Sequence, residues 1–576
     1  MGASTGAAYA VANPGVTDVK ITQQTGTCTG IVKDATGEGV IGASVVVKGT
    51  TNGTITGLDG DFSLSNVKEG DIIVISFVGY ATQEIKWTGK PLDVLLKDDT
   101  QLLGEVVVTA LGMKREEKAL GYAVTELKSE ELYTNTVNPV ASLQGKVAGV
   151  EISNSDGGIF GSAKIQIRGA STLGSNNQPI YVVDGVILDN STQGRDMDGE
   201  EIDAIDYGNE LKNLNPDDFE TVSVLKGAAA TALYGSRGLN GAVVITTKGG
   251  GKFKGFGVDV TQTLGIDHAY KQPSIQTVYG PGARPGRIGY GENGNTWIPT
   301  YYTNAKGEPS LIGASTLGWG LPYDSSVMIE DYDGRKVPYS PIKNNMLDMY
   351  QLGFNTNTNV SVRGGNEKTS FYSSVSYKKV NATTPNNTFE RYAFLVKGSH
   401  KISDRVDVAA SVSFANSKPR NAARAVGEYF YQGLTPLYDA KYYRDKYLSE
   451  QGGIARSGDT YANVPESSKS YWFNIDNMDY NRKETVVRPI LEVNVKIADW
   501  VRFKGEGNMN YVYIREENKE LGTGVAYEGG NYKLAQQTKE QTTFAGTFTF
   551  DKAVKDFNLG GFIRGEYYNN YQTAYS

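Results

Sequence analysis

The feature that most constrains this chain is the alternation of apolar and polar residues through much of its second half. In residues 405–414 (RVDVAASVSF), valine, alanine and phenylalanine take every second position, and mostly polar residues lie between them. Residues 491–497, 501–513 and 543–550 repeat the pattern. A period of two places successive side chains on opposite faces of a β-strand. The second half therefore predicts a large antiparallel sheet with one apolar and one polar face.

Strand and loop lengths favour a transmembrane barrel over a soluble sandwich for this sheet. Strands of about ten residues are joined by tight turns and separated by long loops, as in outer-membrane barrels. Residues 271–350 and 415–485 are long, polar and aromatic, so we expect them on the extracellular side. The composition, with 36 tyrosines and 69 glycines, leaves a tyrosine-rich soluble β-protein as the alternative. The chain contains no run of about 18 apolar residues, which is the length that would predict a transmembrane helix.

Composition and motifs argue against several classes of function. The net charge of −7, without a basic tract, argues against nucleic acid as a partner. Cys28 is the single cysteine, so no internal disulfide forms, and His268 and His400 are too few for a histidine-rich metal site. The glycine pattern of residues 289–294 neither follows a strand nor opens a helix, as a dinucleotide site requires. We therefore expect that the protein is not an enzyme and that it binds neither a cofactor nor a metal ion.

The N-terminal part predicts a compact all-β domain at residues 28–97. Short strand-like segments alternate there with glycine-containing turns, which suggests a small sandwich. Residues 1–27 are expected to be a flexible N-terminus or the remnant of an export signal. Ala8-Tyr9-Ala10 resembles the end of a secretory signal, although the basic and apolar parts of such a signal are absent.

Residues 98–116 form a predicted linker with a strand that has no evident sheet. Its β-branched run consists of Glu105, Val106, Val107, Val108, Thr109 and Ala110. An unpaired strand is a hazard unless it pairs with a partner chain, which main-chain hydrogen bonds allow. The alternative is a strand that pairs within this protein.

Residues 117–250 predict a small α/β domain. We expect short helices at residues 142–148 and 228–235, the second ended by Gly235. The expected strands are residues 150–154, 164–169, 180–185, 221–227 and 242–247.

Several segments carry motifs that are similar to those of one transporter family. Residues 41–50 (IGASVVVKGT) and 76–80 (SFVGY) resemble the carboxypeptidase-regulatory-like domain. VVVTALG (106–112), SLQGKVAGVEIS (142–153) and the longer stretches 165–190 and 214–250 resemble the SusC/RagA group of TonB-dependent transporters. The resemblance runs from residue 28 to at least residue 363.

The resemblance implies a mainly β protein of the outer membrane. It implies an N-terminal β-sandwich, a plug domain at residues 117–250, and the N-terminal part of a transmembrane β-barrel at residues 251–576, because 326 residues supply roughly half of a 22-stranded barrel. The plug and sandwich would lie on the periplasmic side. The run from Glu105 to Ala110 would be the TonB box, pulled by TonB and its proton-driven inner-membrane complex. A SusD-like surface lipoprotein and outer-membrane lipid are the other implied partners.

The resemblance also directs attention to plug residues, each with a structural alternative. Four charged residues are expected to pair with the inner wall of the barrel, unless they are merely solvated: Arg168, Asp184, Lys226 and Arg237. Four glycines are expected to form tight turns rather than to approach a ligand: Gly169, Gly185, Gly235 and Gly238.

The expected cargo is a large nutrient, with an oligosaccharide as first choice and a peptide as second. Aromatic rings stack on sugars, so five loop residues are candidates for the substrate site, with loop packing as the alternative: Trp297, Tyr301, Tyr302, Trp319 and Tyr323. Two other functions stay open. One is a siderophore or cobalamin receptor with the same mechanism, and the other is a surface adhesin or glycan-binding protein that transports nothing.

Overall fold

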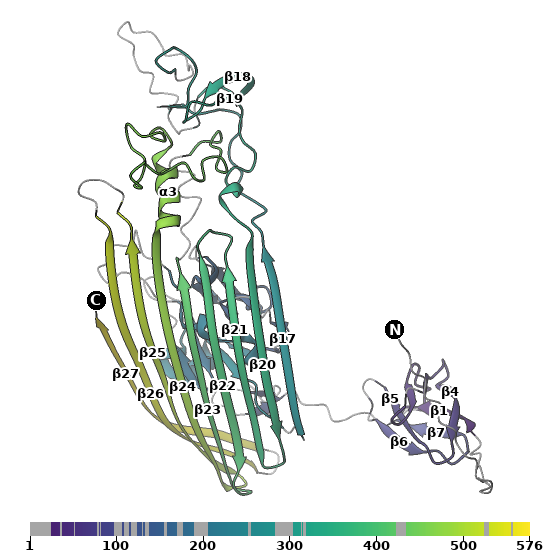
Figure 1. Cartoon of the computed structure of the whole chain (residues 1–576). Coiled ribbons are helices and arrows are strands. Elements are labelled where there is room, and N and C mark those ends of the chain that lie inside the picture. The colour runs from purple at the N-terminus through teal and green to yellow at the C-terminus, as the bar shows by residue number, and fades with distance from the viewer. Residues whose placement is uncertain are drawn as a thin grey trace, which may run out of the picture. The chain divides into compact units, whose positions relative to one another are not determined.

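The computed structural model divides the chain into two compact units. One contains residues 1–106 with 116–119, and the other contains residues 107–115 with 120–576. The structure describes residues 25–575 apart from 35–36, 51, 78–79, 81, 97–105, 109–113, 117–123, 129–130, 133–136, 155–157, 170–176, 189–205, 252–254, 283–302, 313, 315–317, 319, 422–433, 523–528 and 555–556. Each unit is a body of its own (Figure 1).

The first unit is the predicted small β-sandwich. Within the described residues, seven strands form two sheets, in the orders β4-β1-β7 and β3-β2-β5-β6. The strands are β1 (Thr25–Lys33), β2 (Ser44–Val47), β3 (Gly53–Ile55), β4 (Asp61–Lys68), β5 (Ile72–Ser76), β6 (Gln83–Lys86) and β7 (Leu92–Leu95). Alternate residues such as Val45, Ile73 and Ile75 are fully buried between the sheets. β1 begins inside the segment 1–27 that was expected to be flexible, because Thr25 pairs with Lys68.

The predicted linker strand forms at residues 106–108. This strand, β8 (Val106–Val108), makes a two-stranded sheet with β9 (Lys114–Glu116). In the structure this strand therefore pairs within the protein, which is the alternative interpretation of the run. A lone two-stranded sheet is at best marginally stable, so it need not prevent pairing with a partner.

The plug region of the second unit contains a five-stranded sheet and a separate hairpin. The sheet has the order β10-β15-β16-β13-β14, and β11 pairs with β12. The strands are β10 (Val124–Lys128), β11 (Val150–Asn154), β12 (Ala163–Ile167), β13 (Ile180–Val183), β14 (Val186–Leu188), β15 (Phe219–Leu225) and β16 (Ala242–Thr247). Every strand predicted in residues 150–247 is present, whereas β10 and β14 were not predicted.

One of the two predicted plug helices is correct. α1 (Ala228–Tyr234) ends at Gly235, which has a φ of 63°, as expected for a helix-ending glycine. The helix predicted at residues 142–148 is wrong. A short 3₁₀ helix, η4 (Pro139–Leu143), stands there instead, and Gly145 follows it with a φ of 75° that no right-handed helix accommodates.

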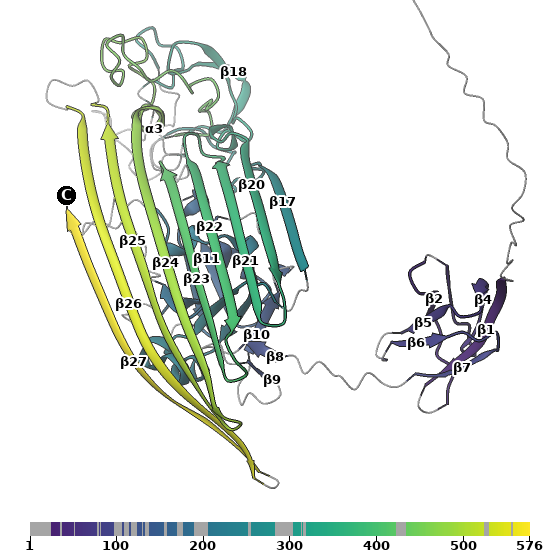
Figure 2. The same cartoon turned by 60° about the horizontal axis from the view of Figure 1, so that its bottom comes forward.

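The second half forms the predicted antiparallel sheet. In the described residues, nine strands lie in the order β17-β20-β21-β22-β23-β24-β25-β26-β27, and each pairs antiparallel with its neighbour (Figures 1 and 2). The strands are β17 (Gly255–Asp267), β20 (Gly353–Gly365), β21 (Thr369–Asn381), β22 (Thr388–Lys401), β23 (Val406–Arg420), β24 (Met478–Ala498), β25 (Val501–Glu520), β26 (Asn531–Val554) and β27 (Phe557–Tyr575). None of the described helices is long and apolar enough to cross a membrane.

The loops at one end of this sheet carry regular structure of their own. The segment between β17 and β20 contains β18 (Asp324–Glu330), β19 (Lys336–Tyr339) and η9 (Leu347–Met349). The segment between β23 and β24 contains α3 (Glu466–Asn477), which runs directly into β24 (Figure 1). At the other end of the sheet the strands are joined by short turns, so the two ends differ as expected for an outer-membrane barrel.

Candidate functional site

The plug region is seated on one face of the nine-stranded sheet, here called the inner face (Figures 1 and 2). Its main contact is residues 209–218 (NELKNLNPDD), here called the anchor segment, whose residues are all buried. Two 3₁₀ helices shape it, η6 (Glu210–Asn213) and η7 (Pro216–Asp218). Asn209 begins η6 by accepting a 3.2 Å hydrogen bond from the backbone N–H of Leu211. Burying so polar a segment requires partners on the sheet.

Buried ion pairs supply the first set of partners. Lys212 Nζ lies 2.8 Å from Glu484 on β24, and Arg482 holds the same carboxylate at 2.7 Å. Glu210 accepts from Arg488 at 3.3 Å and from Asn510 at 2.9 Å. All four charged side chains of the Lys212–Glu484 and Glu210–Arg488 pairs are at most 4% exposed. These pairs fix the anchor segment over β24 and β25.

Neutral and charged hydrogen bonds supply the second set, over β20, β21 and β22. Asn357 donates to Asp217 at 2.6 Å, and Tyr372 donates to Asp218 at 2.9 Å. Arg391, fully buried on β22, donates to the backbone carbonyl of Lys212 at 3.1 Å. Burial raises the pKa of both anchor-segment carboxyls, Asp217 and Asp218, above their usual range.

The four charged plug residues singled out from the sequence fall in different surroundings. Asp184 lies 3.2 Å from Lys397 on β22, and Arg237 forms an ion pair with Glu566 on β27. Lys226 donates instead to the carbonyl of Ala148 within the plug, at 2.9 Å. Arg168 is exposed and has a φ of 63°. The structure thus brings two of the four to the inner face.

The four plug glycines lie at tight points of the backbone. Gly169, Gly185 and Gly235 have φ values of 85°, 88° and 63°, which suit glycine in turns. Gly238 has no such φ, but a Cβ there would lie 2.4 Å from the carbonyl oxygen of Ala230. Close backbone approach therefore requires that glycine.

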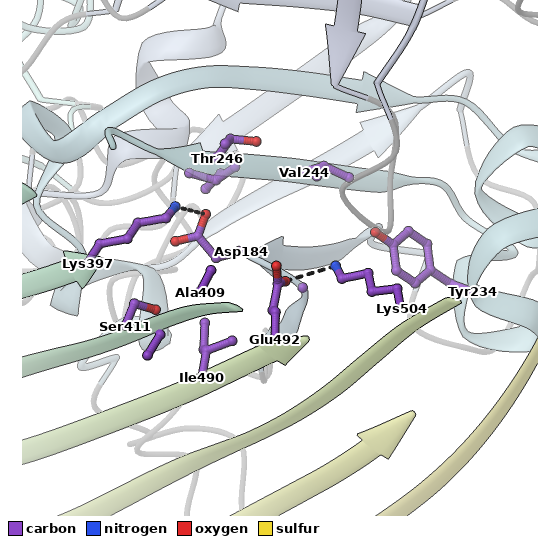
Figure 3. Close-up of a pocket in the computed structure, with 13 residues that line it drawn as sticks. Asp184, Tyr234, Val244, Thr246, Lys397, Ala409, Ser411, Ile490, Glu492 and Lys504 are labelled. Carbon is purple, nitrogen blue, oxygen red and sulfur yellow. Dashed lines mark hydrogen bonds and ion pairs between the residues drawn. The ribbon is translucent and has the colours of Figure 1, made fainter. Parts of the chain in front are cut away.

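A cavity of about 150 Å³ lies between the plug and the inner face, beside Asp184 (Figure 3). Tyr234 and Val244 line it from the plug, and Lys397 and Glu492 line it from the sheet. Sites for drug-sized ligands have volumes of roughly 300–1,000 Å³, so this cavity is too small for an oligosaccharide. It can hold only a few water molecules.

Tyr323 is the aromatic substrate candidate that lies within the described residues. Trp297, Tyr301, Tyr302 and Trp319 lie outside the described residues. Tyr323 is half-buried, and its ring centroid lies 5.0 Å from that of Tyr339. Tyr323 therefore packs against a ring of its own loop, and its role in binding substrate stays a prediction.

The described residues of 303–350 and 434–477, here called the loop module, pack together around buried aromatic rings. Arg444 makes two 2.7 Å bonds to Asp476, and its guanidinium lies 4.2 Å from the centroid of the Trp472 ring. Tyr447 donates to the same carboxylate at 2.6 Å. Asn345 donates to a carbonyl of the other segment, that of Tyr438, at 3.3 Å. The two loops thus present one ordered surface above the sheet.

The residues predicted to couple to TonB are only partly described. Val106, Val107 and Val108 form β8, while Glu105, Thr109 and Ala110 lie outside the described residues. Their role stays a prediction.

Sequence reasoning missed the residues that hold the anchor segment. Glu484 and Arg488 take inward positions on β24, in step with the period-two pattern that predicted the strand. That pattern could have placed them on the polar face. It could not have told buried charges from solvated ones, since both occupy the same positions in the alternation.

Two family models match the chain. The CarboxypepD_reg-like domain matches residues 28–108, and the TonB-dependent Receptor Plug Domain matches residues 116–242. The TonB-dependent receptor SusC of Bacteroides thetaiotaomicron is 35% identical over 400 residues, which are 69% of this chain and 34% of that receptor. The TonB-dependent receptor P39 of Formosa agariphila is 38% identical over 224 residues, 38% of this chain and 20% of that receptor. The chain spans about a third or less of the length of these two relatives.

Solved structures of the RagAB peptide importer share the fold. The open-open state gives a TM-score of 0.58 at 18% identity, covering 81% of this chain and 49% of the solved chain. The closed-closed state gives 0.56, also at 18% identity, covering 79% and 48%. TonB-dependent receptors are proteins of the Gram-negative outer membrane and are not enzymes, in agreement with the sequence-based expectations. The chain therefore belongs to the SusC-like TonB-dependent receptors, of which it carries the CarboxypepD_reg-like domain, the plug and a run of barrel strands.

Proposed function

We propose that the complete receptor imports a large nutrient across the outer membrane, with the plug as the removable stopper of the barrel. The observation that carries this proposal is the seating of the anchor segment on the inner face through buried ion pairs and hydrogen bonds. A plug held in this way blocks the interior of a barrel without being part of its wall.

The polarity of this contact suits repeated opening. Separating two apolar surfaces exposes them to water and costs free energy in proportion to their area. Charged and polar groups such as Lys212 and Glu484 regain hydration when they part into a water-filled channel, which offsets part of the lost attraction. The plug contact can therefore be both specific and reversible.

Force would enter the plug at its edge strand. β10 follows the predicted TonB box in the chain, and it pairs with β15 alone in the described plug sheet. Only five residue pairs join these strands, from Val124–Leu225 to Lys128–Thr221. A short edge strand is the part of a sheet that opens at the lowest free energy. TonB, gripping residues 105–110, would pull β10 first.

The proposed cargo is an oligosaccharide, with a peptide as second choice, and a SusD-like lipoprotein would cover the ordered loop module. Aromatic rings stack on sugars, and partly exposed tyrosines such as Tyr350 and Tyr461 lie at the edge of the buried core of the loop module, which supports the first cargo. The fold shared with the RagAB peptide importer supports the second.

Deletion of residues 105–110 from the complete receptor tests the proposal. Cells would be offered a panel of fluorescently labelled oligosaccharides and peptides, and surface binding and uptake would be measured separately. We expect binding to persist and uptake to stop. Deletion of residues 98–103 from the same linker is the matched control and should leave uptake in place. Uptake at the wild-type rate without residues 105–110 would overturn the proposal and favour a surface adhesin.

Purification from outer membranes separates the SusC-like function from that of a siderophore or cobalamin receptor. A lipoprotein that remains with the receptor through purification is expected for the first. Retention of an iron chelate or a cobalamin, with no lipoprotein, would support the second.

A further inference from the structure

The face of the sheet that points away from the plug carries a row of cations at one level. Because Glu484 and Arg488 face the plug, the odd-numbered positions of β24 face outward. Lys483 on β24 is directly opposite Arg515 on β25. On the other side, Ser417 of β23 pairs with Glu484 and Arg420 pairs with Asn481. Because the register between these two pairs is continuous, Lys418 lies opposite Lys483.

The row continues over two more strands. Lys418 lies opposite Glu390 on β22, which in turn lies opposite Lys379 on β21. Four cations and one carboxylate thus share one level across β21 to β25, for a net charge of +3. All four cations are exposed. We name Lys379, Lys418, Lys483 and Arg515 the cation row.

Neighbouring acids neutralise the cation row only in part. Glu390 lies 3.5 Å from Lys379, and Glu517, one level above, lies 4.0 Å from Arg515. Among the described residues, Lys418 and Lys483 have no ion-pair partner. Like charges directly opposite on a sheet are destabilising, so three adjacent cations call for an anion from outside the chain.

The surroundings place the cation row at a membrane surface. Two residues further along each strand, away from the long loops, the outward positions include Tyr377, Tyr392 and Tyr513. The ring centroids of Tyr377 and Tyr392 are 4.7 Å apart. The level below that is apolar, with Val375, Phe394, Phe414 and Val487. A membrane protein passes from apolar residues beside the lipid tails, through tyrosines at the interface, to cations beside the headgroups. The outer face of this sheet has the same order.

The row also lies at the end of the sheet that carries the long loops. Lys379 is two residues from the end of β21, and Lys418 is two residues from the end of β23. Long loops mark the extracellular end of an outer-membrane barrel, so the row faces the outer leaflet. The headgroups of that leaflet are the anions within its reach.

We propose that the cation row binds the phosphate groups of outer-leaflet lipids of the lipid A type. The geometry suits a lipid that carries two phosphates, because adjacent strands lie about 4.8 Å apart and the three contiguous cations span about 10 Å. Charge-assisted bonds to phosphate oxygens would relieve the repulsion among Lys418, Lys483 and Arg515. This inference rests on the outer-membrane location and not on the import of any cargo.

Lipid titration of the complete, purified receptor in detergent tests the proposal. The probe is bis-phosphorylated lipid A, followed by native mass spectrometry, and the variant is K418Q/K483Q/R515Q. We expect affinity to fall on the order of 10- to 100-fold. The matched control K368Q/R405Q/K552Q removes three exposed cations from the short-turn end and should bind like wild type. The variant K418R/K483R/R515K keeps the charges and should keep the affinity.

Three results would overturn the proposal. The first is equal affinity of the glutamine variant and the wild type. The second is equally tight binding of dephosphorylated lipid A, which would leave the cations no role. The third is displacement of the lipid by millimolar inorganic phosphate alone, since a single free anion would then satisfy the row. A receptor that binds lipid A but imports nothing would leave this inference standing and contradict only the proposed function.

Discussion

Glu484 is the residue on which the seating of the plug depends most. Its carboxylate is fully buried and is shared by Lys212 of the plug and Arg482 of its own strand. Asn213 donates a further bond to it at 2.9 Å. Removing one member of a buried pair leaves the others charged and without compensation, which costs far more than the pair contributes in net stability.

The substitution Glu484→Gln is therefore expected to loosen the anchor segment. We expect the local opening free energy of residues 209–218 to fall by about 3–5 kcal/mol, measured by hydrogen exchange in the complete receptor. Glu390→Gln breaks an exposed pair with Lys379 and should change that free energy by less than about 1 kcal/mol. Equal protection in both variants would show that the buried pair does not hold the plug.

At the scale of elements, the loop module behaves as a small core outside the sheet. α3 contributes Tyr471, Trp472 and Phe473, all nearly fully buried, and it continues into β24 without a loop. Contacts with residues 303–350 tie together two loops that the sequence separates by more than 80 residues. Because these loops are already ordered, the binding of a ligand or a lid has a lower entropic cost.

Replacement of Arg444 by alanine tests that order. The change removes two bonds to Asp476 and the stacking on Trp472, and we expect a local destabilisation of about 1–3 kcal/mol. Hydrogen exchange should rise across residues 434–477. Lys336→Ala, which removes an exposed pair with Glu308, is the control and should leave exchange nearly unchanged. A rise in hydrogen exchange confined to the immediate neighbours of residue 444 would contradict the interpretation that the two loops share one core.

At the scale of the whole molecule, the chain consists of two units with separate cores. The first unit buries its own apolar residues, among them Cys28, Val32 and Trp87. Burial raises the pKa of the Cys28 thiol to about 11. Because the thiolate is the reactive form, the folded unit should protect this cysteine well at pH 8.

An excised fragment of residues 20–98 is therefore expected to fold alone. We expect one cooperative unfolding transition in urea, and labelling of Cys28 by a thiol reagent only above its midpoint. The variant Val45→Asp places a charge between the two sheets and should label without urea. Rapid labelling of the unsubstituted fragment in buffer would mean that the unit needs the rest of the chain.

How much could be predicted depended on how local the controlling interaction is. β16 and β11 were predicted at their observed bounds, because a short β-branched run bounded by turns suffices to define a strand. The helix predicted at residues 142–148 failed because Gly145 takes a left-handed conformation. Of the candidate site, two of four plug charges, Asp184 and Arg237, meet the inner face, but the anchor segment was not anticipated.

The sequence by itself determined the strands, their two faces and the order of domains, because a period of two and turn residues act over a few positions along the chain. Only the tertiary structure decided which polar residues are buried. Glu484 and Lys496 share one face of the same alternating strand, yet Glu484 is fully buried under the plug and Lys496 is partly exposed. What separates them is the packing of a segment more than 260 residues away, and local pattern carries no information on that contact.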